Sequence, residues 1–328
     1  MLSRLKKPDP LIVLIIMAVI VAIIVPARGQ FAEWFALATN IAIAFLFFLY
    51  GARLSTTEAL RGLTNWKLHL TILGFTFVAY PIVGLLLYPL TAVISHELYQ
   101  GILYLTLVPS TVQSSVAFTS IARGNVSGAI VAASVSNLAG VFLTPLLVML
   151  VMGAGDGVSV DTQVFIDIAV LLLLPFVLGQ IARKIVPWVA GAAAHKATKL
   201  VDRGSITMVV YSAFSAGMVA GVWTSVKVCE IVFLIVFSAA LVAFMLWLTR
   251  FISAKAGFPR ADVIAIEFCG SKKSLATGLP MASVIFGGAS LGLLILPLMI
   301  YHQVQLMICS WLAARYGREA EAAEAAHA

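Results

Sequence analysis

Charged residues are scarce in this sequence. Asp, Glu, Lys and Arg make up 11% of the 328 residues, against about 25% in soluble domains. Hydrophobic residues make up 62%, and the mean hydropathy is +1.06. A soluble protein of this length has no means of hiding so much apolar surface from water. The composition therefore excludes a soluble protein and predicts that a lipid bilayer is one of its partners.

Cysteines and catalytic motifs are also sparse. Cys229, Cys269 and Cys309 stand singly in apolar runs, which excludes a disulfide framework or a cysteine-based metal site. The sequence has no HExxH, no GxSxG and no paired intramembrane Asp, so we expect neither an enzyme nor a cofactor. The net charge of +7 is spread over short loops, and we expect no nucleic-acid partner.

Long apolar runs dominate the sequence instead. A run of about 20 apolar residues crosses the hydrocarbon core as a helix, in which every backbone amide is satisfied without water. The alternation that marks a membrane β-barrel is absent. We therefore predict an all-α polytopic membrane protein with ten transmembrane helices. They lie at 10–26, 32–51, 68–92, 99–122, 126–152, 162–188, 205–223, 227–251, 261–286 and 288–314.

Basic residues alternate between the two sides of this segmentation. With the N-terminus inside, the outer segments hold only Arg28 and Lys227, and the outer loop 153–163 holds Asp156 and Asp161. Positive charge marks the cytoplasmic side, so we predict a cell (inner) membrane protein with both termini cytoplasmic. The basic residues on the inner side are Arg4, Lys6, Lys7, Arg53, Arg61, Lys67, Arg123, Arg183, Lys184, Lys196, Lys199, Arg203, Arg250, Lys255, Arg260, Arg315 and Arg318.

Ten spans divide into two sets of five. An odd number of spans in each half places the second half upside down relative to the first, as in transporters with inverted repeats. We therefore predict a first repeat at 1–152, an inverted second repeat at 153–314 and a cytoplasmic tail at 315–328. No dimerisation span is evident, and we expect a monomer.

The fourth span of each half carries an interruption. In 99–122, Pro109 breaks the backbone hydrogen-bond ladder, and in 261–286 the weak helix formers Gly270 and Ser271 lie between charged residues. Paired, interrupted spans at matching positions indicate the binding site of a transporter. The polar residues around the two breaks are Ser110, Thr111, Gln113, Ser114, Ser115, Glu267, Ser271, Lys272, Lys273 and Ser274.

The broken ends have a chemical use. Free carbonyls at one end attract cations, and free N–H groups at the other attract anions. An ionised residue in mid-membrane costs about 2.5–3.5 kcal/mol, so Glu267, Lys272 and Lys273 need a role or a partner. We expect a break at residues 270–271 to let Glu267 meet a lysine. We add Thr76, Asn137 and His302 as weaker candidate ligands, and interpret Pro81 as an ordinary kink.

Several segments together resemble the bile acid:sodium symporter superfamily, solute carrier family 10. They are Pro109 to Asn125, Phe-Cys-Gly-Ser-Lys-Lys-Ser-Leu at 268–275, Phe-Leu-Tyr-Gly-Ala-Arg-Leu-Ser at 48–55 and Ile-Tyr-His at 300–302. The last three segments are similar to one branch of it, that of member 7 and its bacterial homologues. The resemblance implies a panel domain (spans 1, 2, 6 and 7) that rocks against a core domain (spans 3–5 and 8–10). In that core the broken spans 4 and 9 cross.

The resemblance also bears on sodium. Glu267 matches a sodium-ligating glutamate, and Ser114-Ser115 stand for a Ser-Asn pair, so any sodium is expected at Glu267, Ser114 and Ser115. Other ligand positions of the family hold Ala129, Ala133 and Thr76 here, and a lysine stands at the place of a glutamine. An ammonium can take the electrostatic place of sodium, which argues against two-sodium coupling.

We therefore expect a secondary transporter of a small anion, either inorganic or an organic carboxylate such as a bile acid. Lys272 or Lys273 replaces a sodium ion, and the coupling ion is a proton or sodium. The alternative is a membrane regulator of calcium homeostasis or trafficking that transports nothing.

Overall fold

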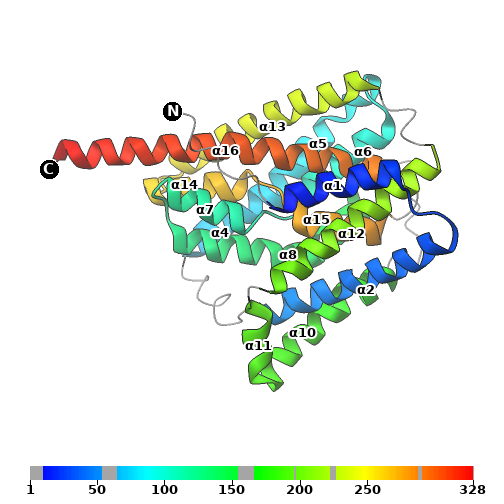
Figure 1. Cartoon of the computed structure of the whole chain (residues 1–328). Coiled ribbons are helices and arrows are strands. Elements are labelled where there is room, and N and C mark those ends of the chain that lie inside the picture. Colours follow the sequence, from blue (N-terminus) through cyan, green and yellow to red (C-terminus); the bar gives the residue numbers. More distant parts are fainter. Residues whose placement is uncertain are drawn as a thin grey trace, which may run out of the picture. The chain divides into compact units, whose positions relative to one another are not determined.

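The computed structural model describes residues 10–53, 65–153, 166–195, 197–221, 227–286 and 290–327. These residues form helices, and no β-strand occurs among them (Figure 1). The prediction of an all-helical multi-pass membrane protein is confirmed. Ten spans, the inverted repeats and the boundaries at 152 and 314 stay predictions. Six described helices are long and apolar enough to cross a bilayer: Gly29–Arg53, Trp66–Ala92, Val126–Val151, Ile166–Ile185, Val228–Lys255 and Leu291–Ala323.

Part of the charge argument lies outside the described residues. The basic residues concerned are Arg4, Lys6, Lys7, Arg61 and Lys196, and both outer-loop acids, Asp156 and Asp161, are outside as well. The cytoplasmic placement of the two termini therefore stays a prediction.

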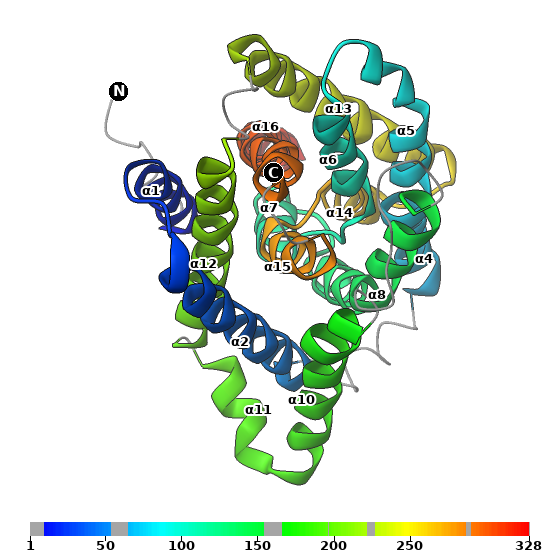
Figure 2. The same cartoon turned by 90° about the vertical axis from the view of Figure 1, so that its right-hand side faces the viewer.

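The chain divides into two compact units. The first contains α1 (Pro10–Ile24), α2 (Gly29–Arg53), η4 (Ala169–Leu173), α10 (Leu174–Ile185), α11 (Pro187–Ala194) and α12 (Thr198–Val219), with most of α15 (Leu275–Ile285) and the first residues of α16 (Leu291–His327). Gly51 and Gly179 let α2 and α10 lie side by side (Figure 2), because a Cβ on Gly179 would lie 2.1 Å from the Phe48 carbonyl oxygen.

The second unit contains both breaks. Its elements are α4 (Trp66–Gly74), η2 (Phe75–Ala79), α5 (Tyr80–Leu86), η3 (Tyr88–Ala92), α6 (His96–Leu107), α7 (Gln113–Ile121), α8 (Val126–Val151), α13 (Val228–Lys255), α14 (Arg260–Gly270), the start of α15 and most of α16. The predicted fourth span is thus α6 plus α7, and the predicted ninth span is α14 plus α15. Both interruptions are present where Pro109 and Gly270–Ser271 predict them.

The third span contains a π-helical turn, η2. The N–H of Tyr80 donates to the carbonyl of Phe75, five residues back, and the next residue, Pro81, has no N–H to donate. When each N–H donates five residues back, the residue that would donate to the Thr76 carbonyl is Pro81. That carbonyl is therefore left without a helical donor. We interpret Pro81 from the sequence as an ordinary kink, and the structure adds that this proline leaves a specific carbonyl inside the unit without a helical donor.

The last helix continues into the segment predicted as the cytoplasmic tail, 315–328. Figure 1 shows α16 running past α7 and α14 towards the C-terminus. Gly317 lies so close to the end of α7 that a Cβ there would be 2.6 Å from the Ile121 carbonyl oxygen. Arg123, which has a φ of 56° in the turn after α7, forms an ion pair of 3.4 Å with Glu321. The start of this tail is therefore packed on the second unit.

Candidate functional site

The two breaks lie against each other inside the second unit. The backbone N–H of Ser274 donates to the Pro109 carbonyl at 2.7 Å. The Ser110 hydroxyl donates to the carbonyl of Cys269 at 2.5 Å, and the Ser115 hydroxyl donates to the carbonyl of Phe268 at 3.1 Å. Polar groups released by one break are thus satisfied largely by the other, as buried backbone requires.

Lys273 places its ammonium in a cage of backbone carbonyls. Its side chain is fully buried, and Nζ donates to the carbonyl oxygens of Thr76, Thr106 and Val108, each at 2.8 Å. The ring of Tyr80 covers the same ammonium, with its centroid 4.1 Å from Nζ. An ammonium has three N–H donors, and here each has a carbonyl.

The three carbonyls come from local features of the sequence. Pro81 and the π-turn release the Thr76 carbonyl, as described above. The other two lie where α6 ends at Leu107, because Val108 is extended and Pro109 cannot continue the helix. The carbonyl between them, that of Leu107, accepts from the Thr144 hydroxyl at 2.9 Å instead.

Aromatic and amide side chains fix the second break. The carbonyl of Ser271 accepts from the hydroxyls of Tyr80 and Tyr301, at 2.5 and 3.0 Å. Gln305 of α16 pairs with the backbone of Lys273 in both directions, accepting from its N–H at 2.9 Å and donating to its carbonyl at 2.8 Å. The segment between α14 and α15 is therefore held in one conformation.

The start of α15 is capped by a residue from the predicted site. The hydroxyl of Ser274 accepts from the backbone N–H of Thr277 at 3.2 Å, which is the geometry of a serine N-cap. The Thr277 hydroxyl donates to Asn137 at 2.7 Å, and the amide of Asn137 donates to the carbonyl of Ser110 at 2.7 Å. Asn137 therefore links α8 to both breaks.

Lys272 has a different environment from its neighbour. Its side chain is also fully buried, but among the described residues no group forms a hydrogen bond with its Nζ. The Nζ atom lies over the ring of Phe118, 3.9 Å from the centroid, and 5.5 Å from the ring centroid of Phe268. Cation–π contacts of this kind supply about 0.5–2 kcal/mol, which is less than the cost of burying an unpaired charge.

Glu267 is bound by residues that we did not predict. One carboxylate oxygen accepts from the Tyr316 hydroxyl at 3.1 Å and the other from the Arg250 guanidinium at 3.4 Å. Arg250 also donates to the Tyr316 hydroxyl, and its guanidinium lies 4.8 Å from the centre of that ring. The expected pairing of Glu267 with a lysine is therefore wrong, because residues of α13 and α16 reach the carboxylate instead.

Four other side chains of the predicted site either bond to residues close in the sequence or are exposed. The hydroxyl of Thr76 donates one turn back to Ile72 at 2.8 Å, so this residue contributes its carbonyl rather than its side chain. Ser114 is hydrogen-bonded to Thr111 at 2.8 Å, and Gln113 is exposed at the start of α7. The Nδ1 atom of His302 lies 2.8 Å from the amide of Gln305.

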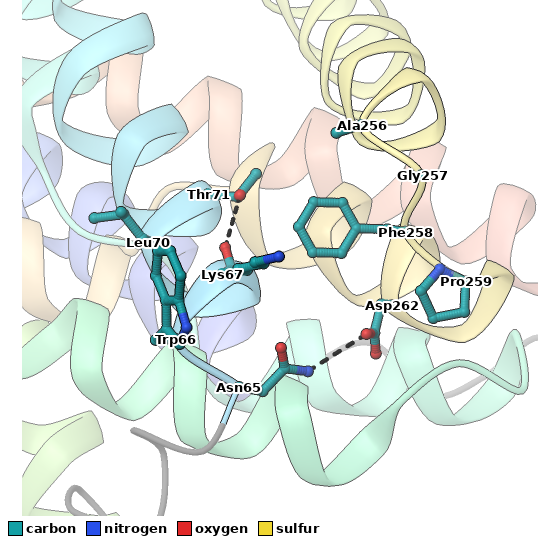
Figure 3. A pocket seen from close by; sticks show the side chains of 10 residues that line it. All are labelled: Asn65, Trp66, Lys67, Leu70, Thr71, Ala256, Gly257, Phe258, Pro259 and Asp262. Carbon is teal, nitrogen blue, oxygen red and sulfur yellow. Dashed lines mark hydrogen bonds between the residues drawn. The ribbon is translucent and has the colours of Figure 1, made fainter.

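A separate pocket of about 520 Å³ lies at the start of α4 and beside the turn between α13 and α14 (Figure 3). Asn65 donates to Asp262 across it at 3.4 Å, and Asn125 donates to the other oxygen of Asp262 at 2.6 Å. None of the predicted binding residues lines this pocket. The hydrogen bonds to Asp262 join the start of α4 and the turn before α8 to the start of α14.

Sequence reasoning missed six residues that organise the breaks. They are Tyr80, Tyr104, Arg250, Tyr301, Gln305 and Tyr316. Signals that could have pointed to some of them are an aromatic residue next to a proline, as at Tyr80-Pro81, and polar residues at helical spacing, as at Tyr301 and Gln305. Arg250 and Tyr316 gave no such signal, because Arg250 falls at the end of a predicted span and Tyr316 falls beyond the last one.

A multi-pass helical protein in which two broken helices meet has the architecture of a secondary transporter. The chain belongs to the SBF-like CPA transporter family (DUF4137), whose model matches residues 9–318. It is a membrane transporter by family rather than an enzyme.

Curated relatives cover nearly the same length. The chain is 46% identical over 322 residues to the uncharacterized protein PA2026 of Pseudomonas aeruginosa. The matched residues cover 97% of this chain and 96% of the relative. It is 44% identical to the putative symporter YfeH of Escherichia coli, over 97% of this chain and 95% of the relative. It is 32% identical to sodium/bile acid cotransporter 7 of Rattus norvegicus, over 83% of this chain and 81% of the relative. The resemblance to solute carrier family 10 is thereby confirmed.

Proposed function

We propose that this protein is a secondary active transporter of a small anion, and that the ammonium of Lys273 replaces a sodium ion in its core. The anion is an organic carboxylate or an inorganic ion, bound where the two breaks meet. The observation that carries this proposal is the contact of one buried ammonium with the carbonyls of Thr76, Thr106 and Val108.

The carbonyl cage is a cation site by its chemistry. Backbone carbonyls replace the hydration shell of monovalent cations in membrane proteins, and helix C-terminal ends and unwound carbonyls hold sodium in transporters with broken helices. Lys273 fills this cage with a cation that is part of the chain and cannot diffuse away. A transporter built in this way needs no sodium ion at this position.

The opposite ends of the breaks are suited to an anion. The helix α7 begins at Gln113 without a side-chain cap, so the N–H groups of its first turn are available to a negatively charged group. Ser114 and Thr111 add hydroxyls at the same turn. The division of the chain into two units supports a panel and a core, because the helices of each unit largely match the spans that the resemblance assigns to each domain.

Uptake by proteoliposomes tests the proposal. Anions that raise the melting temperature of the purified protein are chosen first, with and without sodium. Uptake of each labelled anion is then measured under a sodium gradient, a proton gradient and no gradient. We expect uptake without sodium in the wild type and loss of uptake in Lys273→Met, with Lys255→Met as the matched control because Lys255 is exposed at the end of α13.

Two results would contradict the proposal. Uptake that requires sodium would exclude the replacement of sodium by Lys273, and undiminished uptake by Lys273→Met would exclude the site. If no anion is taken up and the charges of Glu267, Lys272 and Lys273 are dispensable in cells, the non-transporting regulator is favoured instead.

A further inference from the structure

We propose that Lys272 is the residue that carries the coupling proton, so that two adjacent lysines have separate roles. Lys273 is a fixed cation, and Lys272 alternates between the neutral amine and the ammonium during transport. This inference rests on the proposed function, and it names the coupling ion and the atom that carries it.

Geometry separates the two lysines. Both side chains are fully buried, but the Lys273 ammonium has three carbonyl acceptors. In the described part of the chain Lys272 Nζ has none and faces the ring of Phe118. A buried charge is tolerated only where it is paired or hydrogen-bonded. Lys273 meets that condition, whereas Lys272 meets it only when it is neutral or when it reaches water or an anion.

The groups around Lys272 do not supply a counter-charge. Among the described residues, the titratable groups that interact electrostatically with it are the thiols of Cys269 on α14 and Cys309 on α16, while the α7 residue against it is the apolar Phe118. Glu267 lies within electrostatic range of Cys309 but is already bound by Arg250 and Tyr316.

Other candidate proton carriers are tied into structural contacts. The Glu267 carboxylate has two donors, as described, and His302 is hydrogen-bonded to Gln305, which also pairs with the Lys273 backbone. Protonation of Glu267 removes the charge that its two donors stabilise, and protonation of His302 at Nδ1 displaces the Gln305 amide. Among the described residues at the breaks, Lys272 has a buried amine with no hydrogen-bond partner, so it can gain a proton without losing a hydrogen bond.

The proton step is simple. When the site opens to water on one side, the lone pair of Nζ takes a proton from hydronium and leaves a water molecule, and the resulting ammonium attracts the anion. When the site opens to the other side, the anion leaves and the ammonium returns its proton to water. Each cycle moves one proton with the anion, and Phe118 covers the neutral amine in the closed arrangement.

A test of the protonation state needs no substrate. The unfolding equilibrium of the wild type, Lys272→Met and Lys255→Met is measured in mixed micelles between about pH 6 and pH 9. If the native state holds Lys272 neutral and the unfolded state holds it charged, the unfolded state binds one more proton and raising the pH favours the native state. We expect the unfolding constant of the wild type to fall relative to Lys272→Met by up to about tenfold per pH unit.

The control and the contradicting result are defined by the same curves. Lys255→Met removes an exposed lysine, and its curve is expected to run parallel to that of the wild type. If the Lys272→Met curve is also parallel to that of the wild type, Lys272 has the same charge in both states and the proposal is wrong. An NMR spectrum of protein labelled with ¹⁵N-lysine tests the same point without unfolding. A signal from a neutral side-chain amine that disappears in Lys272→Met would show that Lys272 is neutral in the native state.

The transport role is tested with Lys272→Arg, which holds a permanent charge. With an anion that the wild type takes up, this variant is expected to keep exchange of internal for external anion and to lose net uptake driven by a pH gradient. Net pH-driven uptake at the wild-type rate would overturn the proposal. Failure of the proposed function gives a different pattern, in which the wild type itself transports no anion whatever the unfolding curves show.

Discussion

The hydroxyl of Tyr316 donates to the buried carboxylate of Glu267 at 3.1 Å. This contact joins the last helix to the final turn of α14, just before the break. Glu267 is 1% exposed, so its charge depends on this hydroxyl and on Arg250 for stabilisation. The contact joins a residue from the predicted tail, 315–328, to a predicted site residue. It makes the start of the predicted tail a structural part of the second unit.

Replacing Tyr316 by Phe therefore lowers stability. The change removes a donor from a buried carboxylate and leaves the ring in place, and we expect a loss of about 1.5–3 kcal/mol, as for a hydrogen bond to a charged group. Thermal unfolding in detergent measures it. Tyr88→Phe, at an exposed tyrosine of η3, is the matched control, and equal shifts in the two variants would show that the Glu267 contact contributes nothing.

Removing the two lysine charges one at a time gives opposite results. Lys273→Met leaves the carbonyls of Thr76, Thr106 and Val108 buried without the ammonium, and at about 1–3 kcal/mol for each orphaned group the loss is expected to be several kcal/mol. Lys272→Met removes an amine without a described hydrogen-bond partner and is expected to be neutral or stabilising near pH 7. Unfolding in mixed micelles compares them, and similar losses in both would contradict the assignment of separate roles.

Pro81→Ala introduces a backbone N–H in the π-turn. That donor competes with Lys273 for the Thr76 carbonyl, and we expect reduced uptake even where the protein stays folded. Pro145→Ala in α8 is the matched control, because that proline also lies inside a helix. Wild-type uptake by Pro81→Ala would show that the released carbonyl is not needed.

Glycine substitutions test the packing behind the first break. A Cβ on Gly140 would lie 2.7 Å from Cβ and Cγ of Pro109, so Gly140→Ala is expected to displace the break and to destabilise the protein by about 1–3 kcal/mol. Gly74→Ala is the control, since a Cβ at that position would meet no atom of a neighbouring element within 4 Å. That change is expected to be neutral or to stabilise by up to about 1 kcal/mol.

The sequence predicts the breaks themselves because their causes are local. Pro109 cannot donate an N–H, and Gly270 and Ser271 weaken the helix wherever they occur. The partners of Glu267 were not predictable in the same way. Arg250 lies near the end of α13 and Tyr316 lies beyond the predicted end of the last span, and only the folded chain brings them to the carboxylate.

The carbonyl cage around Lys273 could not be predicted from the sequence, for a different reason. Its ligands are main-chain oxygens, which every residue possesses, so no residue type at positions 76, 106 or 108 identifies them. The lysine, by contrast, was visible as an ionisable residue in mid-membrane. The sequence thus identified the cation and the broken helices but not the atoms that bind the cation.

The cage has a consequence for how such a site is found by mutation. Alanine scanning replaces side chains and leaves carbonyls in place, so Thr76→Ala, Thr106→Ala and Val108→Ala all keep the three oxygens that hold the ammonium. A scan of this kind would register Lys273 as an isolated essential residue with no partners. Ester substitution of the backbone, which weakens or moves single carbonyl acceptors, is the approach that would reveal the other half of the site.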